Sequence, residues 1–341
     1  MTSPSAAPAA DQTRSADRPA RQSAYIGAVV ITFNPDQQRV GQVLAAIAPQ
    51  VRTVVVVDNG SALDPASYLA PPGATPVHLI SLGDNCGIAA AQNIGLDWAR
   101  QQGCTHVLLL DHDALASPGL VEALLAEMQR RESRGERVAA VGPLIHDPRR
   151  AAPSPFFRLT RCWIRRLYRP DPGEHSARTD FLIAAGTLLS LAAAAEVGPM
   201  EESLFIDYVD LEWSLRATSR GYRLYGHFDV ALDHRLGEEP LELFGRRVTA
   251  HSPLRHYYLV RNALALWRLP HTPWHWKCLD ALHLLRKCLL FGTLAPRRGE
   301  HLRMMLHGLA DGLRGRYGRQ DQARRGWRVP QELRARAARR L

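Results

Sequence analysis

Between residues 25 and 142, short runs of apolar residues alternate with segments in which apolar residues recur every three or four positions. The short runs are continuous and rich in β-branched residues, which is typical of buried strands, whereas the longer periodicity predicts amphipathic helices. The predicted strands are 28–32, 53–57, 77–81 and 107–110, and the predicted helices lie within 40–47 and 87–100. Strands that alternate with helices in this way predict an α/β fold with a parallel sheet covered on both faces.

The pattern becomes less regular after Pro143. A stretch containing proline and arginine covers 148–172, an apolar block runs from Phe181 to Ala195, and an acidic segment covers 201–212. The apolar block is shorter than the ~20 residues that a membrane-spanning helix needs, so we expect no spanning helix. A helix at 213–219, a strand at 223–232 and helices from about 251 onward complete the prediction. We therefore divide the chain into a disordered leader (1–24), an α/β domain (25–250) and a helical, basic C-terminal region (251–341).

The net charge of +10 is concentrated at the C-terminal end. Residues 297–341 contain 13 arginines and four acidic residues, a difference of +9. Such a region suits nucleic acid or an anionic membrane surface, or is a solvated charged helix. We favour the membrane surface and expect no nucleic-acid partner, because Trp267, Trp274 and Trp276 lie among basic residues and leucines, as in interfacial helices. Packing of these helices on the rest of the chain or on a second copy in a homo-oligomer is the alternative.

The five cysteines include no CxxC pair, so neither a zinc site nor a disulfide framework is indicated. Cysteines of this kind fit a reducing compartment. Residues 1–22 are rich in alanine, serine and proline and contain no apolar core of a signal peptide. These features predict a cytoplasmic protein that is peripheral at the inner face of the plasma membrane.

Polar side chains follow the carboxyl ends of the predicted strands. They are Asn34, Asp58, Asn59, Asp111 and Asp113. Ligands bind at this edge of an open α/β sheet. Asn34 and Asn59 could equally serve as turn residues, but two acids separated by one residue gain nothing in a turn. Two carboxylates at a strand end can hold a hard cation and leave coordination positions for phosphate and water.

Five segments of the chain occur in the order and spacing of glycosyltransferase family 2. They are VVITFNPD (29–36), VVVVDNGS (54–61), NCGIAAAQNIGLDWA (85–99), LLLDHDA (108–114) and FIDYVDLEWSLRATSRGYRLY (205–225). The chain resembles this family over residues 25–265, and more narrowly the bacterial rhamnosyltransferases that extend cell-surface polysaccharides. The resemblance implies a GT-A fold, in which a Rossmann-like mixed sheet is flanked by helices, and a nucleotide-sugar donor.

The resemblance also assigns roles to individual residues. Asp111 and Asp113 match the family's metal motif, with Mg or Mn expected, and His234 matches a further metal ligand. Asp210 matches the general base that takes the proton of the acceptor hydroxyl as the sugar is transferred with inversion. A carboxylate suits this role when it is partly desolvated and free of a salt bridge. Asp207 is a second candidate for the base. The remaining substrate-binding matches are Thr32, Phe33, Asn34, Asp58, Asn85, Gly87, Asp111, Glu212 and Arg261.

The metal motif departs from that of many related rhamnosyltransferases, which read Asp-Gln-Asp-Ser where this chain has His112 and Ala114. This difference leaves the metal role intact and weakens the assignment of rhamnose. The resemblance implies transfer of L-rhamnose from dTDP-rhamnose to a saccharide acceptor that is lipid-linked, in bacterial cell-surface polysaccharide synthesis.

Four other functions deserve comparison with this prediction. A family 2 transferase with a UDP-sugar donor stays open. A Rossmann oxidoreductase needs G-x-G-x-x-G after the first strand, where this chain reads TFNPDQ. A sugar nucleotidyltransferase needs a glycine-rich first loop with a basic residue, and Phe33-Asn34-Pro35 does not supply one. A non-catalytic nucleotide-sugar or nucleic-acid binding protein would need neither Asp210 nor the acidic pair, so we rank it behind a hexosyltransferase.

Overall fold

The computed structural model describes residues 24–327, except 68, 70–74, 151, 161–162, 171, 236, 238–240, 244–245 and 249–250. The predicted disordered leader, apart from its last residue, and the last 14 residues of the arginine-rich end lie outside the described residues. Only the backbone is described for the short strands β12 (Leu241–Leu243) and β13 (Arg246–Val248), which pair with each other.

A mixed sheet forms the centre of the fold, with strands in the order β3-β2-β1-β4-β10-β6-β11-β5, and β9 also pairs with β11. The first four strands, β1 (Ile26–Thr32), β2 (Thr53–Asp58), β3 (Val77–Ser81) and β4 (His106–Asp111), run parallel, as predicted. The other strands are β5 (Leu115–Ala116), β6 (Val138–His146), β9 (Ser176–Thr179), β10 (Leu188–Ser190) and β11 (Arg223–Asp233). The short β10 lies antiparallel between β4 and β6, which makes the sheet mixed.

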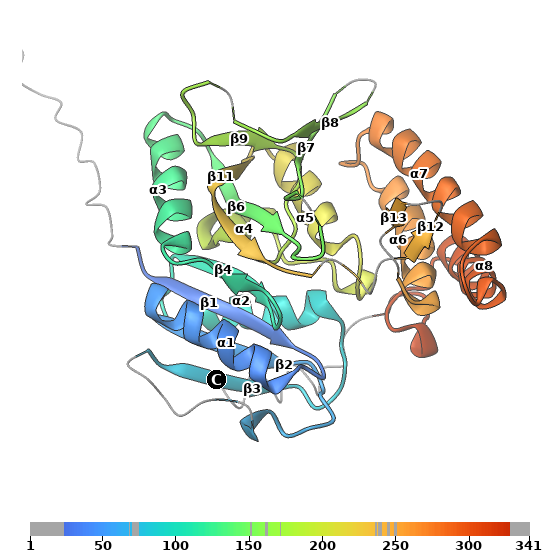
Figure 1. The fold of residues 1–341 in the computed structure, drawn as a ribbon, viewed down its shortest axis with the longest axis horizontal. Helices are drawn as coiled ribbons and strands as arrows, with labels where there is room; N and C mark the ends of the chain where they lie inside the picture. Colours follow the sequence, from blue (N-terminus) through green and yellow to red (C-terminus); the bar gives the residue numbers. More distant parts are fainter. Residues whose placement is uncertain are drawn as a thin grey trace, which may run out of the picture.

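Helices cover both faces of this sheet (Figure 1), and alternate residues of its strands divide the core between them. On β1, Val29 and Ile31 join one hydrophobic cluster, while Ala28 and Val30 join the other, as the two-residue repeat of a strand requires. The first cluster contains α2 (Ile88–Gln101), α4 (Leu191–Val197) and α5 (Val209–Ser219). The second contains α1 (Gln37–Ile47) and α3 (Leu120–Ser133). The predicted α/β architecture is therefore confirmed.

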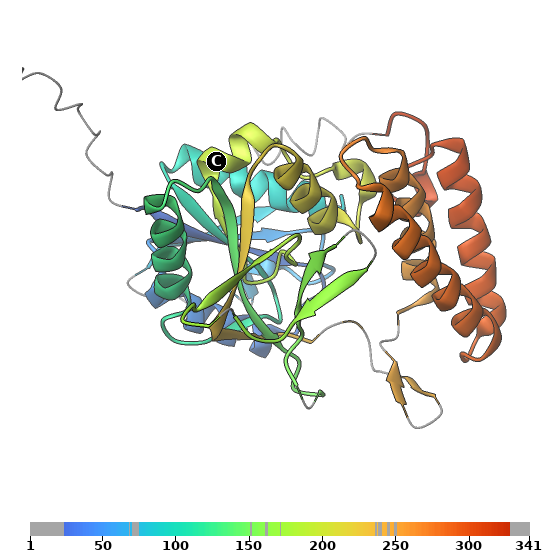
Figure 2. The same cartoon turned by 90° about the horizontal axis from the view of Figure 1, so that it is seen from above.

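Three further helices, α6 (Pro253–Arg268), α7 (Trp274–Thr293) and α8 (Arg298–Arg314), lie side by side at one end of the molecule (Figures 1 and 2). Helix α6 begins after Ser252, whose hydroxyl accepts from the backbone N–H of Arg255, and Pro253 occupies its first turn. A methyl group at Gly308 of α8 would lie 2.4 Å from the carbonyl oxygen of Tyr257, so glycine permits the close approach of α6 and α8.

The apolar block from Phe181 to Ala195 does not form one element. Residues 181–187 form a loop, β10 and α4 follow it, and Gly186 has a φ of +79°, which ends any helical continuation. None of the helices in the described part of the chain combines the length and the apolarity needed to span a bilayer. A two-stranded hairpin, β7 (Phe156–Leu159) and β8 (Ile164–Leu167), packs beside this loop.

Candidate active site

A cleft of about 880 Å³ opens at the carboxyl ends of the parallel strands, between the sheet, the 205–210 segment and the helices α6 and α7. Its volume is within the range of sites for small molecules and cofactors. The structure places nine of the residues singled out in the sequence in its lining: Phe33, Asn59, Asn85, Gly87, Asp111, Asp113, Asp207, Asp210 and His234. Residues from both halves of the chain therefore meet where an open α/β sheet binds its ligands.

Asp111, Asp113 and His234 form a compact cluster in this cleft, with one ligand atom of each residue within 4.8 Å of the others. Asp111 ends β4, and the guanidinium of Arg39 donates to the carbonyl oxygen of Asp113 at 3.1 and 3.0 Å, which holds the following turn. Strand β5 then pairs with the end of β11 and so places His234 beside the turn. The imidazole lies 3.0 Å from Asp113 Oδ1 and 3.5 Å from Asp111 Oδ2.

The chemistry of this cluster fits a divalent cation. Burial raises the pKa of Asp111. Burial lowers the pKa of His234, but Asp113 and Asp111 outweigh burial and raise it overall. Although Nδ1 of His234 lies close to a carboxylate, it is buried and has no well-directed hydrogen bond among the described residues. Two carboxylates and an imidazole whose ligand atoms lie this close together suit the ligand set of a metal ion.

A network of side-chain amides joins the loops that follow β1, β2 and β3. The amide oxygen of Asn34 accepts from the backbone N–H of Ala62 at 2.8 Å. Asn59 donates to Asn85 Oδ1 at 3.2 Å, and the same oxygen accepts from the backbone N–H of Gly87. Phe33, which is 42% exposed, projects into the cleft beside this network. The network presents an aromatic ring and amides to a ligand at the β1–β2 end of the cleft.

Asp58 and Thr32 lie directly behind the cleft lining, not in it. The Asp58 carboxylate is 1% exposed and accepts from the Thr32 hydroxyl at 3.0 Å and from the backbone N–H of Ser61 at 3.0 Å. The Ser61 hydroxyl also donates to this carboxylate. These contacts shape the loop that carries Asn59, and the predicted contact of Asp58 with a nucleotide stays a prediction.

Asp207 and Asp210 both line the cleft but differ in their partners. Asp207 accepts two hydrogen bonds from the Arg255 guanidinium, at 2.7 and 2.5 Å, and is therefore held in a bidentate ion pair. No ion pair involves Asp210 within the described ranges. Its carboxylate accepts from the backbone N–H of Leu211 at 2.9 Å, and burial raises its pKa to about 6. Of the two carboxylates, Asp210 has the environment of a general base.

The loop before Asp210 has a conformation that non-glycine residues rarely adopt, because Phe205, Asp207 and Tyr208 all have positive φ angles of 64–67°. Asn262 on α6 donates to the carbonyl oxygens of Leu204, Ile206 and Asp207 at 2.8–3.0 Å. On the other side, the Phe205 carbonyl accepts from the first N–H of α2 at 2.8 Å. The loop is thus fixed between α2 and α6, where it presents Asp207 and Asp210 to the cleft.

Two predicted substrate contacts, those of Glu212 and Arg261, have other partners in the structure and do not line the cleft. The Glu212 carboxylate is 3% exposed and pairs with Arg216 and with His271 Nε2 at 2.9 Å. Arg261 is fully buried and donates to the carbonyl oxygens of Gly318 and Leu204. We therefore assign Arg261 to the support of the 204–208 loop and do not carry either residue into the proposed substrate site.

The sequence patterns did not indicate the basic side of the cleft. Arg255 on α6 and Lys287 on α7 line it, and burial lowers the pKa of Lys287. Gln92 on α2 also lines it, and its buried Oε1 has no hydrogen bond among the described residues. No local signal marks these residues, because their approach depends on how the C-terminal helices pack against the sheet.

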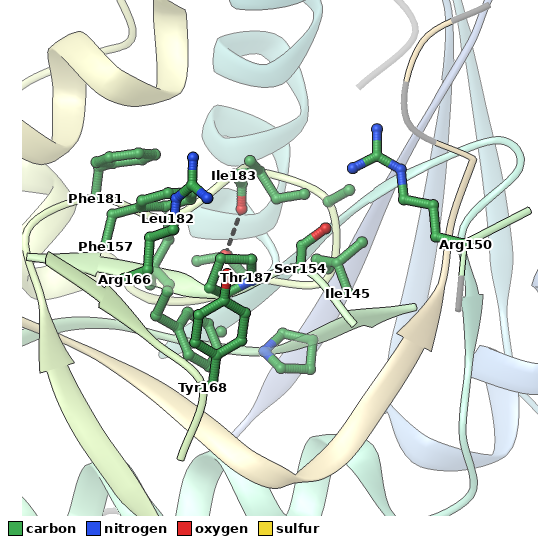
Figure 3. Close-up of a pocket in the computed structure, with 15 residues that line it drawn as sticks. Ile145, Arg150, Ser154, Phe157, Arg166, Tyr168, Phe181, Leu182, Ile183 and Thr187 are labelled. Atoms are coloured by element: carbon green, nitrogen blue, oxygen red, sulfur yellow. Dashed lines mark hydrogen bonds between the residues drawn. The ribbon is translucent and has the colours of Figure 1, made fainter. Parts of the chain in front are cut away.

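A smaller pocket of about 420 Å³ adjoins the cleft and shares Arg150, Ile183 and Ala185 with it. The β7–β8 hairpin, β6 and the 181–187 loop enclose this pocket (Figure 3).

Comparison with known proteins agrees with this architecture. A structure of S. aureus TarS 1-349 in complex with UDP-GlcNAc is similar, with a TM-score of 0.52 and 15% identity over 91% of this chain and 83% of that one. A structure of GalNAc-T7 with UDP, GalNAc and Mn2+ has a TM-score of 0.52 and 12% identity, and the match covers 77% of this chain and 55% of that one. The fold is therefore the GT-A fold, with a helical C-terminal region.

Sequence comparison identifies the family. The model of glycosyl transferase family 2 matches residues 28–178. The dTDP-rhamnosyl transferase RfbF of Shigella flexneri is 30% identical over 290 residues, which cover 85% of this chain and 96% of RfbF. An N-acetylglucosaminyl-diphospho-decaprenol L-rhamnosyltransferase of Mycobacterium tuberculosis is 25% identical over 81% of this chain and 96% of its own length. The chain belongs to glycosyltransferase family 2. It is an enzyme of that family, and it has homologues among the rhamnosyltransferases.

Proposed function

We propose that this protein transfers L-rhamnose from dTDP-rhamnose, with inversion, to a lipid-linked saccharide acceptor in bacterial cell-surface polysaccharide synthesis. The observation that carries the proposal is the presence of two chemically distinct groups in one cleft. The cluster of Asp111, Asp113 and His234 suits a cation bound to a diphosphate, and Asp210 suits a base. The names of the two rhamnosyltransferase relatives support the choice of donor and acceptor.

The proposed reaction is a single displacement. The oxygen of an acceptor hydroxyl attacks the anomeric carbon of the donor sugar, a carbon–oxygen bond forms, and the bond from this carbon to the diphosphate oxygen breaks. The hydroxyl proton passes to the Asp210 carboxylate, and the electron pair of the broken bond leaves with the nucleoside diphosphate. Because base and leaving group act on opposite sides of the anomeric carbon, the configuration inverts. Asn262 and Arg261 act as positioning residues, since they hold the loop before Asp210.

Asp111, Asp113 and His234 would hold the divalent cation, which neutralises charge on the leaving diphosphate. Mg and Mn both accept carboxylate ligands, and the imidazole favours Mn of the two, because Mn binds nitrogen more readily. The cation-binding side chains come from β4, the turn after it and the end of β11, which are held in register by the β5–β11 pairing.

The donor assignment is tested with purified protein and a panel of nucleotide-sugars. Thermal stabilisation by dTDP-rhamnose in the presence of Mn, and release of dTDP when the lipid-linked acceptor is added, are the expected results. Stabilisation and turnover with UDP-sugars instead would refute the rhamnose donor and keep the transferase. Binding of nucleotide-sugars without any turnover would favour a binding protein.

We also propose that the protein associates peripherally with the inner face of the plasma membrane, and the surface of the C-terminal helices supports the association itself. In the described part of the chain, exposed large apolar side chains gather on α7, on α8 and on the residue just after α7. They are Trp274, Leu282, Leu285, Leu289, Leu294, Leu302, Leu306, Leu309 and Leu313. The leucines of each helix recur at intervals of three and four, so they form one face per helix. The two faces adjoin where Leu302 of α8 lies against Gly292 of α7, since a methyl group added at Gly292 would be 3.9 Å from the Leu302 side chain. We refer to the two faces together as the leucine surface.

Exposed arginines accompany this leucine surface. Arg286, Arg298, Arg303 and Arg314 form no ion pair with the described residues. An apolar face accompanied by uncompensated arginines suits an anionic bilayer, to which each basic residue can contribute ~1 kcal/mol. Of the three tryptophans that suggested this association, Trp274 is exposed, whereas Trp276 is buried in the main core and Trp267 donates to Asp280.

A further inference from the structure

The pocket beside the cleft has no role in the proposed displacement, and its lining is that of a ligand site (Figure 3). Its volume of about 420 Å³ is typical of a small-molecule site. Phe157 of β7 and Phe181 stack with ring centres 5.1 Å apart and planes only 6° from parallel. The Trp276 ring packs edge-on against Phe181, 5.9 Å away, so α7 supports this aromatic wall from behind. Tyr168 adds a third ring and is 62% exposed.

Besides Thr187, whose hydroxyl donates to the carbonyl oxygen of Ile183 at 2.6 Å, three polar side chains interrupt the apolar lining (Figure 3). The Ser154 hydroxyl is buried and has no hydrogen bond with any described residue. Buried hydroxyls are rarely left without a partner, so this oxygen indicates a ligand or a water molecule that completes it. Arg166 lies directly opposite Phe157 on the hairpin and makes no hydrogen bond or ion pair with the described residues. Arg150 lies at the far end of the pocket, 3.6 Å from the Asp147 carboxylate (Figure 3).

The pocket also lies next to the proposed base. Ile183 and Ala185 line both the pocket and the cleft. Between them, Ala184 lies beside Asp210 in the cleft lining, and its backbone N–H is near enough to the carboxylate to lower the pKa of Asp210. A ligand that lies in the pocket and extends across Ile183 and Ala185 therefore brings its nearest group to Asp210.

We propose that this pocket binds a sugar ring of the acceptor, and this proposal rests on the proposed transferase function. The apolar C–H face of a pyranose buries its surface well against aromatic rings. Its hydroxyl groups can accept from Arg166 and Arg150 and pair with Ser154. A hydrocarbon chain would leave the buried Ser154 hydroxyl without a hydrogen-bond partner. A nucleotide is not the proposed occupant of this pocket, because the larger cleft beside the cation cluster is the proposed site of the nucleotide-sugar.

The hairpin provides a matched pair of variants for a test. Arg165 and Arg166 are adjacent and exposed, and neither forms a hydrogen bond or an ion pair with the described residues. Their side chains nevertheless point to opposite faces of the two-stranded hairpin. Binding of methyl glycosides of hexoses, N-acetylhexosamines and 6-deoxyhexoses is measured by saturation-transfer NMR, without donor. We expect at least one glycoside to bind the wild-type protein, and R166A and Tyr168→Ala to weaken it about tenfold or more. R165A should bind as the wild type does.

The same variants are then assayed for transfer to the lipid-linked acceptor. R166A should raise the acceptor KM about tenfold and leave hydrolysis of the donor by water unchanged. Glycosides that fail to bind the wild-type protein, or that bind R166A equally well, would overturn the proposal. The proposal would also be overturned if R166A raised the KM for the lipid-linked diphosphate acceptor but left glycoside binding unchanged. The pocket would then bind the diphosphate or the lipid. If glycosides bind as expected but dTDP-rhamnose is not turned over, the rhamnose donor is wrong and the pocket stands.

Discussion

Replacing Asp210 by asparagine removes the proposed base and, at the same time, a carboxylate whose ionisation in the folded protein is unfavourable. Burial raises its pKa from 3.8 to about 6. The folded protein therefore binds this proton more tightly than the unfolded chain does. Ionisation costs nothing below pH 3.8, costs more as the pH rises towards 6, and reaches its full cost above 6. At 1.36 kcal/mol per pKa unit, the full cost is about 3 kcal/mol.

The asparagine variant escapes this cost because its side chain carries no charge, and its amide oxygen can still accept the backbone hydrogen bond from Leu211. We expect Asp210→Asn to raise the free energy of unfolding by up to about 3 kcal/mol at pH 8, and by almost nothing at pH 3.5. The measurement is urea unfolding at both pH values with a chelator present. Asp207→Asn is the matched control. It should lower stability at pH 8, because it replaces the charged partner of Arg255 with a neutral one.

Activity should move in the opposite direction to stability. Loss of a general base typically costs 10²–10⁴-fold in rate, so Asp210→Asn should transfer at least about 100 times more slowly and still bind donor. In the wild type, kcat/KM should fall tenfold per pH unit below about 6, as Asp210 becomes protonated. A variant that keeps more than a tenth of the wild-type rate would remove Asp210 from the base role. An unchanged stability at pH 8 would refute the raised pKa.

Three other predictions follow from contacts already described. Asp113→Ala should abolish the thermal stabilisation by nucleotide-sugar that depends on Mn, and a chelator should have the same effect on the wild type; stabilisation that survives both would remove the cation. Asn262→Ala should cost about 2–3 kcal/mol of stability and lower kcat more than it raises the donor KM, because three loop carbonyls lose their donor. Leu285→Glu combined with Leu306→Glu should weaken sedimentation with anionic vesicles at least tenfold, whereas Leu63→Glu, at an exposed leucine elsewhere, should not.

The first part of the fold could be predicted from the sequence because buried parallel strands are continuous apolar runs, and all four predicted strands lie where the structure has β1 to β4. The insertion of β10 between β4 and β6 could not be predicted in the same way. This strand has three residues, and its place depends on pairings with Val141 and Leu108, which are distant in the chain. The apolar pattern of the 181–195 block shows only that it is buried.

The candidate site could likewise be predicted only in part. Asp111 and Asp113 stand at the end of a recognisable strand, so the sequence indicates both their position and their chemistry. The choice between Asp207 and Asp210 depends on Arg255, which is 48 residues away and approaches only because α6 packs across the 204–208 loop. The same packing places Arg261 against backbone carbonyls. The family resemblance marked Arg261 as a substrate-binding residue, whereas the structure shows its guanidinium bonded to backbone carbonyls, a contact that the local sequence does not indicate.

Helix α7 connects the proposed membrane association to the chemistry of the cleft. Lys287 lies on the side of α7 that lines the cleft, whereas Leu285 and Leu289 belong to the exposed leucine surface on its other side. Trp276, near the start of the same helix, supports the Phe181 ring of the proposed acceptor pocket. A bilayer in contact with the leucines would therefore lie about one helix diameter, ~10 Å, from the basic wall of the cleft. A saccharide joined to its lipid by a diphosphate can cross that distance while the lipid stays in the membrane. Its phosphates would then lie near Lys287 and its sugar near Asp210.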